Sequence, residues 1–438
     1  MRLFLRQLFS LDTVMVTMAT CVAVALLYVV PQNFDFLSPM SQALGHFDVT
    51  DMVFSKFRDD NRRQTDSSIV IVNIGDLDRA GIASLLLRVA AEQPKAIGLD
   101  ALLLSPRDPF GDSVLAAALA STRNVVLVKK LAHRSDFRST DSVVLGGYTE
   151  STDADEHNRY FDTVIHSLPS FTHHAVQGFA NLVTEGEGAA LTCREVSFQE
   201  PTPAGSAYSF PLQVARIADS TAAQRALDRG NHVETINYLG NVQAFRRYDV
   251  ADVIDPSTDL SSLRGAIVLM GFMGESFDDD SNTDKFFTPL NSQYVGRSLP
   301  DMFGVVVHAN VLSMILRNDF IDTMSTESGI FIGLAVLLFN VALFSTIFAA
   351  FEDWYDTLAL ILQLVQSVLC LYLTIVVFDK YSYKLDLTPT LLGIALVGTV
   401  HSLYQDSLKK IIVKAWQSSR SATQRLRKQP QKPTEPLP

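Results

Sequence analysis

Long apolar stretches, one near the start of the chain and three crowded into its last quarter, constrain the fold more than any other feature. They cover residues 13–30, 329–351, 358–378 and 387–404. A segment needs about 20 mostly apolar residues to cross the hydrocarbon core of a membrane, and its backbone must be helical to satisfy its own hydrogen bonds there. The sequence therefore predicts one spanning α-helix, a large domain over residues 31–328, and three further spanning helices.

Basic residues predict the orientation. Arg2 and Arg6 precede the first apolar stretch, and the tail of residues 405–438 is rich in Lys and Arg. Because basic residues beside spanning segments stay in the cytoplasm, we expect both termini there, and we expect the tail to be disordered. The large domain is then periplasmic and the membrane a bacterial inner membrane, although the residues leave open whether the host is Gram-negative. Residues 31–35 lack a small-residue cleavage site, which favours an uncleaved anchor.

Charge and composition exclude several classes of function. The net charge is -11 although the tail is basic, so the acidity lies largely in the periplasmic domain. An acidic surface does not suit a phosphate backbone, and we expect no nucleic acid partner. No Ser–His–Asp or Cys–His arrangement and no Gly-rich phosphate loop stands out, so we expect neither an enzyme nor a cofactor.

The hydrophobic pattern of the domain alternates between strands and helices. Continuous β-branched or apolar runs predict buried strands, and apolar residues at helical spacing predict the helices between them. The predicted strands are 68–74, 96–99, 124–128, 233–239 and 266–272, and the predicted helices are 83–91, 113–119, 211–217, 221–228, 251–254 and 303–316. Strand–helix–strand order implies parallel strands with crossover helices. The sequence predicts an α/β domain with a mostly parallel sheet, interrupted by a less regular region over residues 131–232.

Blocks of sequence in a fixed order resemble the CHASE2 domain. They read IVIVNIGDLD, QPKAIGLDALLLSPRDP, VETINYLG, and AIVLMGFMGES followed by TDKFFTPL and PDMFGVVVHANVLSMIL, and they cover most of residues 68–317. The resemblance implies an extracytoplasmic sensory domain of a bacterial receptor with one span before it and three after it. Family members usually continue into a cytoplasmic output domain, which residues 405–438 are too short to form. The resemblance therefore implies sensing without an enzymatic output in this chain.

Carboxylates near the ends of predicted strands suggest a ligand site. Asp100 ends a predicted strand, and open parallel sheets bind ligands beyond such ends. If Asp76, Asp78 and Asp284 converge there with Asp100, the site binds a cation or a cationic ligand. The alternative is that each aspartate caps a helix or turn.

Two residues of the last resembling block complete the candidate ligand site. His308 and Asn310 lie in that block, in an apolar helical pattern. A single histidine in such a pattern is more often a buried structural residue than a functional one.

A second acidic cluster invites a metal interpretation. Asp278, Asp280 and Asn282 place oxygen ligands at alternating positions, as Ca²⁺ sites do. Thr283 stands where a calcium loop needs glycine and Pro289 where it needs glutamate, which favours a solvated acidic loop.

Small and polar residues in the apolar stretches predict helix packing. Gly329 and Gly333 form a G-x-x-x-G pattern, and Asn340, Gln363 and Gln366 need partners on other helices. The pattern leaves open whether the helices pack within one chain or form a homodimer.

These features favour a sensor that binds an unknown extracytoplasmic ligand or protein and relays the signal to a separate cytoplasmic or membrane partner. The alternative is a structural or scaffold subunit of an envelope complex, whose periplasmic domain binds protein. A tethered hydrolase is a third reading, and it requires Asp100, His308 and Asp284 to converge in one cleft.

Overall fold

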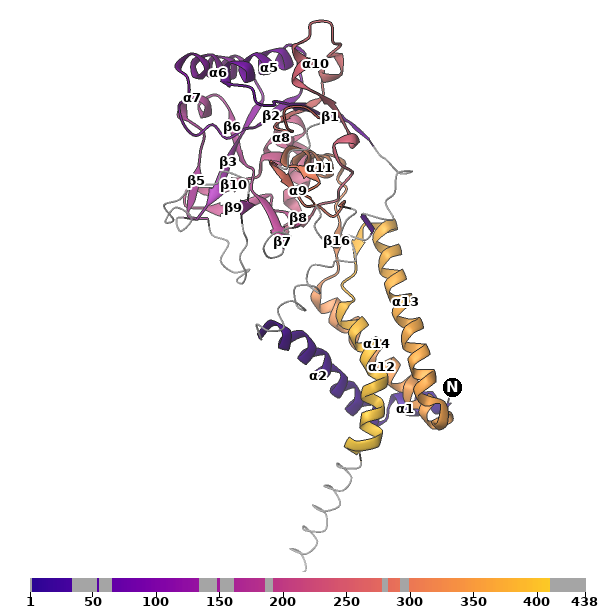
Figure 1. Ribbon diagram of the computed structural model, residues 1–438. Coiled ribbons are helices and arrows are strands. Elements are labelled where there is room, and N and C mark those ends of the chain that lie inside the picture. The colour runs from indigo at the N-terminus through magenta and orange to yellow at the C-terminus, as the bar shows by residue number, and fades with distance from the viewer. Residues whose placement is uncertain are drawn as a thin grey trace, which may run out of the picture. The chain divides into compact units, whose positions relative to one another are not determined.

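The computed structural model describes residues 2–33, 53–54, 65–133, 148–149, 161–185, 192–277, 283–291 and 299–409. Its chain divides into two compact units (Figure 1). The helical unit comprises Met1–Ser41 and Thr323–Pro438, and the α/β unit comprises Gln42–Asp322.

A seven-stranded sheet forms the centre of the α/β unit. Its strands lie in the order β12, β1, β13, β2, β3, β5, and β6 also pairs with β3. Every neighbouring pair is parallel except β3 and β5. The strands are β1 (Asp66–Asn73), β2 (Ala96–Asp100), β3 (Val125–Ala132), β5 (Thr163–Ile165), β6 (Val176–Phe179), β12 (Phe245–Tyr248) and β13 (Ile267–Gly271). The predicted α/β fold with a mostly parallel sheet is confirmed.

Helices cover both faces of this sheet (Figure 1). One face packs against α5 (Arg79–Ala91), α6 (Pro109–Ser121), α7 (Pro169–Thr172) and α10 (Val250–Ile254). The opposite face packs against α8 (Phe210–Ala218) and α11 (Gly304–Arg317), and α9 (Ser220–Asp228) contacts both of these helices. Because both faces are covered, the central strands β1, β2 and β13 are continuous apolar runs over most of their length rather than alternating.

Aspartates cap two of the helices on one face of the sheet, and glycines allow a helix to pack closely on the other face. Asp78 and Asp108 precede α5 and α6, and each carboxylate accepts a 2.7 Å hydrogen bond from a backbone N–H of the first helical turn. On the other face, a Cβ at Gly98 would lie 2.6 Å from the ring of Phe210, and a Cβ at Gly178 would lie 2.5 Å from the Phe210 Cα. Glycine at both positions lets α8 lie directly on β2 and β6.

The predicted strand over residues 233–239 is mostly wrong. Only Glu234–Thr235 (β11) is extended and paired, and its partner is not in the central sheet. It lies in a four-stranded sheet with β8 (Thr192–Val196), β7 (Leu182–Glu185) and β4 (Tyr148–Thr149). The N–H groups of Leu239 and Gly240 bond to the side chain of Asn310 instead of to a strand. The place beside β1 is taken by β12, which lies outside the predicted strands.

Two further pairs of strands complete the α/β unit. They are β9 (Gln199–Thr202) with β10 (Gly205–Tyr208), and β14 (Lys285–Phe286) with β15 (Met302–Phe303). Both pairs are antiparallel. The region predicted to be less regular, residues 131–232, thus contains short strands in its described parts.

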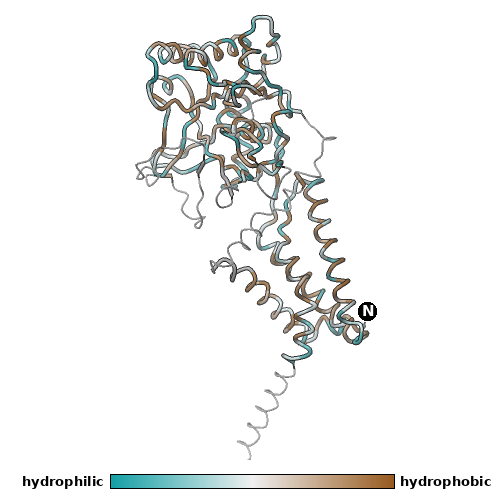
Figure 2. Tube along the Cα trace, in the orientation of Figure 1, coloured by the Kyte–Doolittle hydropathy of each residue, from teal (hydrophilic) through white to brown (hydrophobic). Residues whose placement is uncertain are grey.

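The helical unit contains the apolar stretches. It comprises α1 (Arg2–Leu8), α2 (Leu11–Asn33), α12 (Thr326–Ala350), α13 (Tyr355–Tyr381) and α14 (Thr388–Leu403), with the short strand β17 (Tyr383–Lys384) before α14. Figure 2 shows the hydrophobic colour running along these helices.

Two helical segments, Thr326–Ala350 and Glu352–Tyr381, are long and apolar enough to cross a membrane. The other two predicted spans do not reach this length where side chains are described. Helix α14 has 16 residues and is followed by a π-helical turn from Tyr404. Helix α2 has 23 residues, and its apolar part with described side chains is Leu11–Leu27. The structure thus supports two of the four predicted spans by length.

Candidate functional site

Three central strands of the α/β unit end side by side. The register pairs Asn73 of β1 with Gly271 of β13, and Gly271 with Asp100 of β2. This is the carboxyl-terminal edge of a parallel sheet, where open α/β folds bind ligands. The structure therefore places Asp100 at the carboxyl end of a parallel strand, as predicted.

Asn73 organises the backbone around this edge. Its side-chain amide donates to the Asp249 carboxylate at 2.9 Å and to the Gly274 carbonyl at 3.0 Å. Its side-chain oxygen accepts from the N–H groups of Gly75 and Met273, both at 2.9 Å. Sequence reasoning missed Asn73, although a polar residue that ends a run of β-branched residues was a usable signal.

Asp284 lies beside this edge and contacts the first residue of α11. Its carbonyl accepts from the N–H of Gly304 at 3.0 Å, and a Cβ at Gly304 would lie 3.5 Å from its carboxylate. The next residue, Val305, packs on Gly271, where an added Cβ would approach it to 2.7 Å and would lie 3.3 Å from the Cβ of Asp100. The first turn of α11 therefore borders both aspartates.

The charge of Asp284 acts on Asp100. Burial, and secondly the charge of Asp284, raise the pKa of Asp100 to about 8. Burial raises the pKa of Asp284 to about 6. Neither carboxylate has an ion-pair partner among the residues that the structure describes. A cation that enters between them would relieve the cost of holding negative charge here.

The other predicted aspartates have different surroundings. Asp78 is the N-cap of α5, which agrees with the capping alternative, and Asp76 is exposed in the turn before it. Asp278, Asp280 and Asn282 lie outside the described residues. Within the described part of the chain, no three His, Cys, Asp or Glu side chains gather closely enough to hold a metal ion.

His308 and Asn310 are buried in α11. The His308 ring packs edge-on against Phe210 with 5.3 Å between centroids, and burial lowers its pKa to about 4, so the imidazole is neutral. Asn310 accepts from the N–H groups of Leu239 and Gly240, and donates to the carbonyls of Gly240 and Val306. Asn310 therefore holds a loop in place.

Arg79 fixes the segment that follows Asp100. Its buried guanidinium pairs with Asp112 in the first turn of α6 and donates to the carbonyl of Ser105. It also lies over the ring of Phe171, 5.2 Å from the centroid. Sequence reasoning did not select Arg79, because an arginine at a helix start looks like a solvent-exposed residue.

In the helical unit, the predicted packing residues contact other helices of the same chain. A Cβ at Gly333 would lie 3.0 Å from the Thr390 hydroxyl of α14. Gly329 is the exception, because a Cβ there would meet Met324 and the Asp386 carbonyl, which lie outside the helices. Gln366 of α13 donates to the Asn340 side chain of α12 at 2.6 Å. Gln363 donates to the carbonyls of Ile394 and Ala395 in α14, at 3.0 and 2.8 Å.

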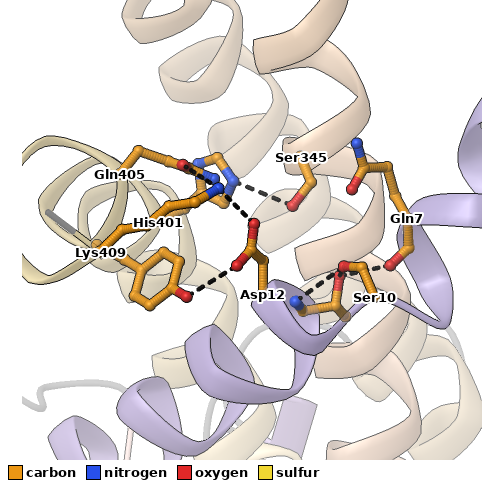
Figure 3. Close-up of polar contacts among 9 residues, drawn as sticks. Gln7, Ser10, Asp12, Ser345, His401, Gln405 and Lys409 are labelled. Atoms are coloured by element: carbon orange, nitrogen blue, oxygen red, sulfur yellow. Dashed lines mark hydrogen bonds and ion pairs between the residues drawn. The ribbon is translucent and has the colours of Figure 1, made fainter. Parts of the chain in front are cut away.

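A cluster of polar contacts connects the first helices of the helical unit to the last (Figure 3). Asp12, at the start of α2, accepts from the Tyr404 hydroxyl at 2.9 Å and from the Lys409 ammonium at 2.6 Å. Beside it, His401 of α14 bonds to the Ser345 hydroxyl at 3.0 Å and to the Tyr355 hydroxyl at 2.9 Å. Side chains from α2, α12, α13 and α14 thus meet at one level of the unit.

Comparison with protein-family models matches residues 20–347 to the CHASE2 domain. That range covers more than half of the chain, including the central sheet, Asp100, Asp284 and α11. No curated protein and no solved structure matches the chain.

Proposed function

We propose, from the premise that this chain belongs to the CHASE2 family, that it is a membrane-bound extracytoplasmic sensor whose α/β unit detects the signal. CHASE2 domains are extracellular sensory domains. The sheet edge with the two partly buried carboxylates of Asp100 and Asp284 supports a binding role for this unit. The hydrolase reading is not proposed. It requires His308 to face a cleft with Asp100 and Asp284, whereas the neutral His308 ring packs on Phe210 in the interior.

The ligand proposed for this site is a cation or a cationic small molecule. The observation that carries this proposal is that Asp100 and Asp284 both border the first turn of α11 without an ion-pair partner among the described residues, and burial raises the pKa of each. Separated charges at a protein surface do not need such neutralisation, because water screens them. A ligand ammonium group or a hydrated metal ion between the two carboxylates would supply it.

The helical unit is proposed to hold the protein in a bacterial inner membrane. Helix α13 supports this, because large apolar side chains are exposed along its length. They are Leu360, Ile361, Leu364, Val365, Val368, Leu369, Tyr372 and Leu373. A helix that exposes such residues needs an apolar solvent. We propose that α2 and α14 cross together with α12 and α13, which leaves both termini in the cytoplasm and the α/β unit in the periplasm.

The signal is proposed to reach a separate cytoplasmic or membrane partner through the tail. Lys409 is the last described residue of the chain and lies in the basic tail of residues 405–438, and its ammonium pairs with Asp12 of α2. A shift of α2 relative to α14 would therefore change the position of the first residues of the tail. A ligand drives such a shift only if it binds the two arrangements with different affinity.

The cation proposal is tested on the full chain in lipid nanodiscs by thermal unfolding. The probes are Ca²⁺, Mg²⁺ and spermidine, each titrated at a pH of about 9, where both carboxyls are ionised. A probe at about 100 times its dissociation constant should stabilise the folded state by about 2.7 kcal/mol. Asp100→Asn and Asp284→Asn should abolish the response.

Asp76→Asn is the matched control, because Asp76 is an exposed aspartate of the same sheet edge region. It should keep the full response. A response that survives in both Asp100→Asn and Asp284→Asn would place cation binding elsewhere. The cation proposal fails if none of the three probes raises the unfolding temperature of the unsubstituted chain.

A scaffold role is the second candidate, and exposed apolar residues favour it. Phe110, at the start of α6, is 70% exposed, and Leu87 of α5 is 45% exposed. Large exposed apolar side chains mark protein contacts when they gather in patches. Purification in mild detergent distinguishes the roles: envelope-assembly subunits that are lost with Phe110→Ser support the scaffold, and a kinase or cyclase supports the sensor.

A further inference from the structure

Helix α11 connects the candidate ligand site with the end of the α/β unit. Its first residues, Gly304 and Val305, border Asp284 and Gly271. Its residues from Gly304 to Ile315 are all buried, and the Ser313 hydroxyl donates to Asp66 at the start of β1 at 2.7 Å. A continuous helix of 14 residues is about 21 Å long, so α11 reaches from the candidate ligand site to the far end of the unit.

The segment after α11 is held against the α/β unit. Asn318 ends the helix in the left-handed conformation, and the N–H of Asp319 bonds back to the Met314 carbonyl at 3.1 Å. The side chain of Asn237 donates to the Asp319 carbonyl at 3.2 Å. Phe320 and Ile321 are buried. The chain therefore does not leave the unit at the end of the helix.

Arg229 holds the final residue of this segment. Its guanidinium lies 4.5 Å from the centroid of the Phe320 ring and pairs with Asp322 at 2.9 Å. The guanidinium is itself oriented by Glu234, a residue 3% exposed, at 2.6 Å. Asn231 donates to the same carboxylate at 3.0 Å. The buried Glu234 thus orients Arg229, and Arg229 forms an ion pair with the exposed Asp322.

The next fixed point belongs to the helical unit and is very close in sequence. The N–H of Met324 donates to the Lys384 carbonyl at 3.0 Å, and Ser325 is the N-cap of α12. Thr323 alone lies between Asp322 and Met324. Two steps along a chain span at most about 7.6 Å, so no slack separates the two anchors.

We propose that Arg229 is a latch that couples α11 to the membrane helix α12 through Asp322. This inference rests on the proposed sensing function. It identifies the contact through which the α/β unit would pass the signal to the membrane helices. While the latch holds, a displacement of α11 at the Asp284 end is passed through Asp322 and Thr323 to α12. When the latch opens, the segment from Asn318 to Thr323 takes up the displacement and α12 is uncoupled.

Hydrogen exchange of the full chain in nanodiscs, followed by mass spectrometry, tests the latch. The main variant is Asp322→Asn, because Asp322 is 63% exposed and its loss leaves Arg229 paired with Glu234. Exchange in residues 318–325 should accelerate about two- to fivefold, the factor that an exposed ion pair of this kind supplies. Arg229→Ala should have a larger effect, because it also removes the contact with Phe320.

The control is Arg264→Ala, which removes another ion pair of the same unit, with Glu92 at 3.3 Å. It should leave exchange in residues 318–325 unchanged, and all variants should leave residues 66–73 and 267–271 unchanged. If Asp322→Asn and Arg229→Ala both leave exchange in residues 318–325 at the unsubstituted rate, there is no latch.

A double-mutant cycle separates the latch from the proposed function. Asp284→Asn perturbs the site conservatively, since Asp284 has φ of +59° and asparagine tolerates that conformation. It should change exchange at the start of α12, residues 326–335, in the chain with an intact latch but not together with Asp322→Asn. An effect that persists with Asp322→Asn overturns the latch as the relay. If Asp284→Asn has no effect at α12 in either background, the proposed relay from this site fails, and the exchange of residues 318–325 still decides whether the latch exists.

Discussion

The hydroxyl of Tyr404 donates a hydrogen bond to Asp12, 392 residues earlier in the chain, at 2.9 Å. Together with the Lys409 ion pair, this bond joins the start of α2 to the residues after α14. The two ends of the described helical unit are therefore in direct contact. Any rearrangement that carries a signal through this unit must keep or break these contacts.

The Asp12–Lys409 pair should show a small, measurable coupling. Both side chains are about a third or more exposed, so solvent screens the pair, and we expect a coupling of about 0.5 kcal/mol. The measurement is a double-mutant cycle of Asp12→Asn and Lys409→Met, with unfolding in mixed micelles followed by tryptophan emission. Lys380→Met is the control and should show no coupling to Asp12→Asn. If the effect of Lys409→Met on the free energy of unfolding simply adds to that of Asp12→Asn, as expected for Lys380→Met, the contact between Asp12 and Lys409 is contradicted.

Stability should depend on pH through Asp100. The folded pKa values of Asp100 and Asp284 are about 8 and about 6, above the ordinary 3.8, so the folded state binds more protons than the unfolded state in this range. The free energy of unfolding contributed by these groups therefore falls as pH rises from about 4 to about 8. His308, with its pKa lowered to about 4, acts in the opposite direction below about 6.5.

The comparison that isolates Asp100 lies between about pH 7 and pH 8, above the range in which His308 acts. In this range the free energy of unfolding of the unsubstituted chain should fall by up to about 1.4 kcal/mol per pH unit relative to that of Asp100→Asn. Urea unfolding at a series of pH values measures the difference. Parallel profiles for the two chains would show that Asp100 titrates normally.

Asn310 should act on stability and not on ligand binding. Asn310→Ala leaves the N–H groups of Leu239 and Gly240 without their side-chain acceptor, and should lower the free energy of unfolding by about 1–3 kcal/mol. The cation response of the remaining folded protein should be unchanged. A variant with unchanged stability and no cation response would instead make Asn310 a ligand residue.

Alanine at Gly98 and at Gly178 should destabilise the α/β unit for different reasons. At Gly98 the added methyl group meets the far end of the Phe210 ring, whereas at Gly178 it meets the Phe210 backbone. We expect a loss of about 1–3 kcal/mol at Gly98 and a larger loss at Gly178. Phe210→Leu should partly rescue Gly98→Ala but not Gly178→Ala, as measured by urea unfolding. Rescue of both variants would contradict the close approach of α8 to β6.

The regular parts of the α/β unit were predictable because both faces of its sheet are covered. Burial on both faces makes β1, β2 and β13 continuous apolar runs, and such runs are visible in a sequence. Strand β12 was missed because it lies at the edge of the sheet, and its FRRY sequence exposes two arginines. The short strands between residues 176 and 208 were missed for a similar reason, since their pairing depends on contacts distant in sequence.

The candidate site was predictable only in part. Asp100 follows a buried run, so its position at a strand end could be inferred. Its proximity to Asp284 depends on the register of β2 beside β13 and on the start of α11, which local patterns do not encode. The same holds for Arg229, whose partners Glu234 and Asp322 are 5 and 93 residues away.

The position of β1 within the central sheet has a consequence for synthesis. Both neighbours of β1 are late strands, since β12 begins at Phe245 and β13 ends at Gly271. Neither hydrogen-bonding edge of β1 therefore has a native partner strand until Phe245, the first residue of β12, has left the ribosome, and the second partner is complete only at Gly271. A chaperone that binds extended apolar segments would find its target in this interval, and truncation before residue 245 should yield a product that aggregates instead of a smaller folded unit.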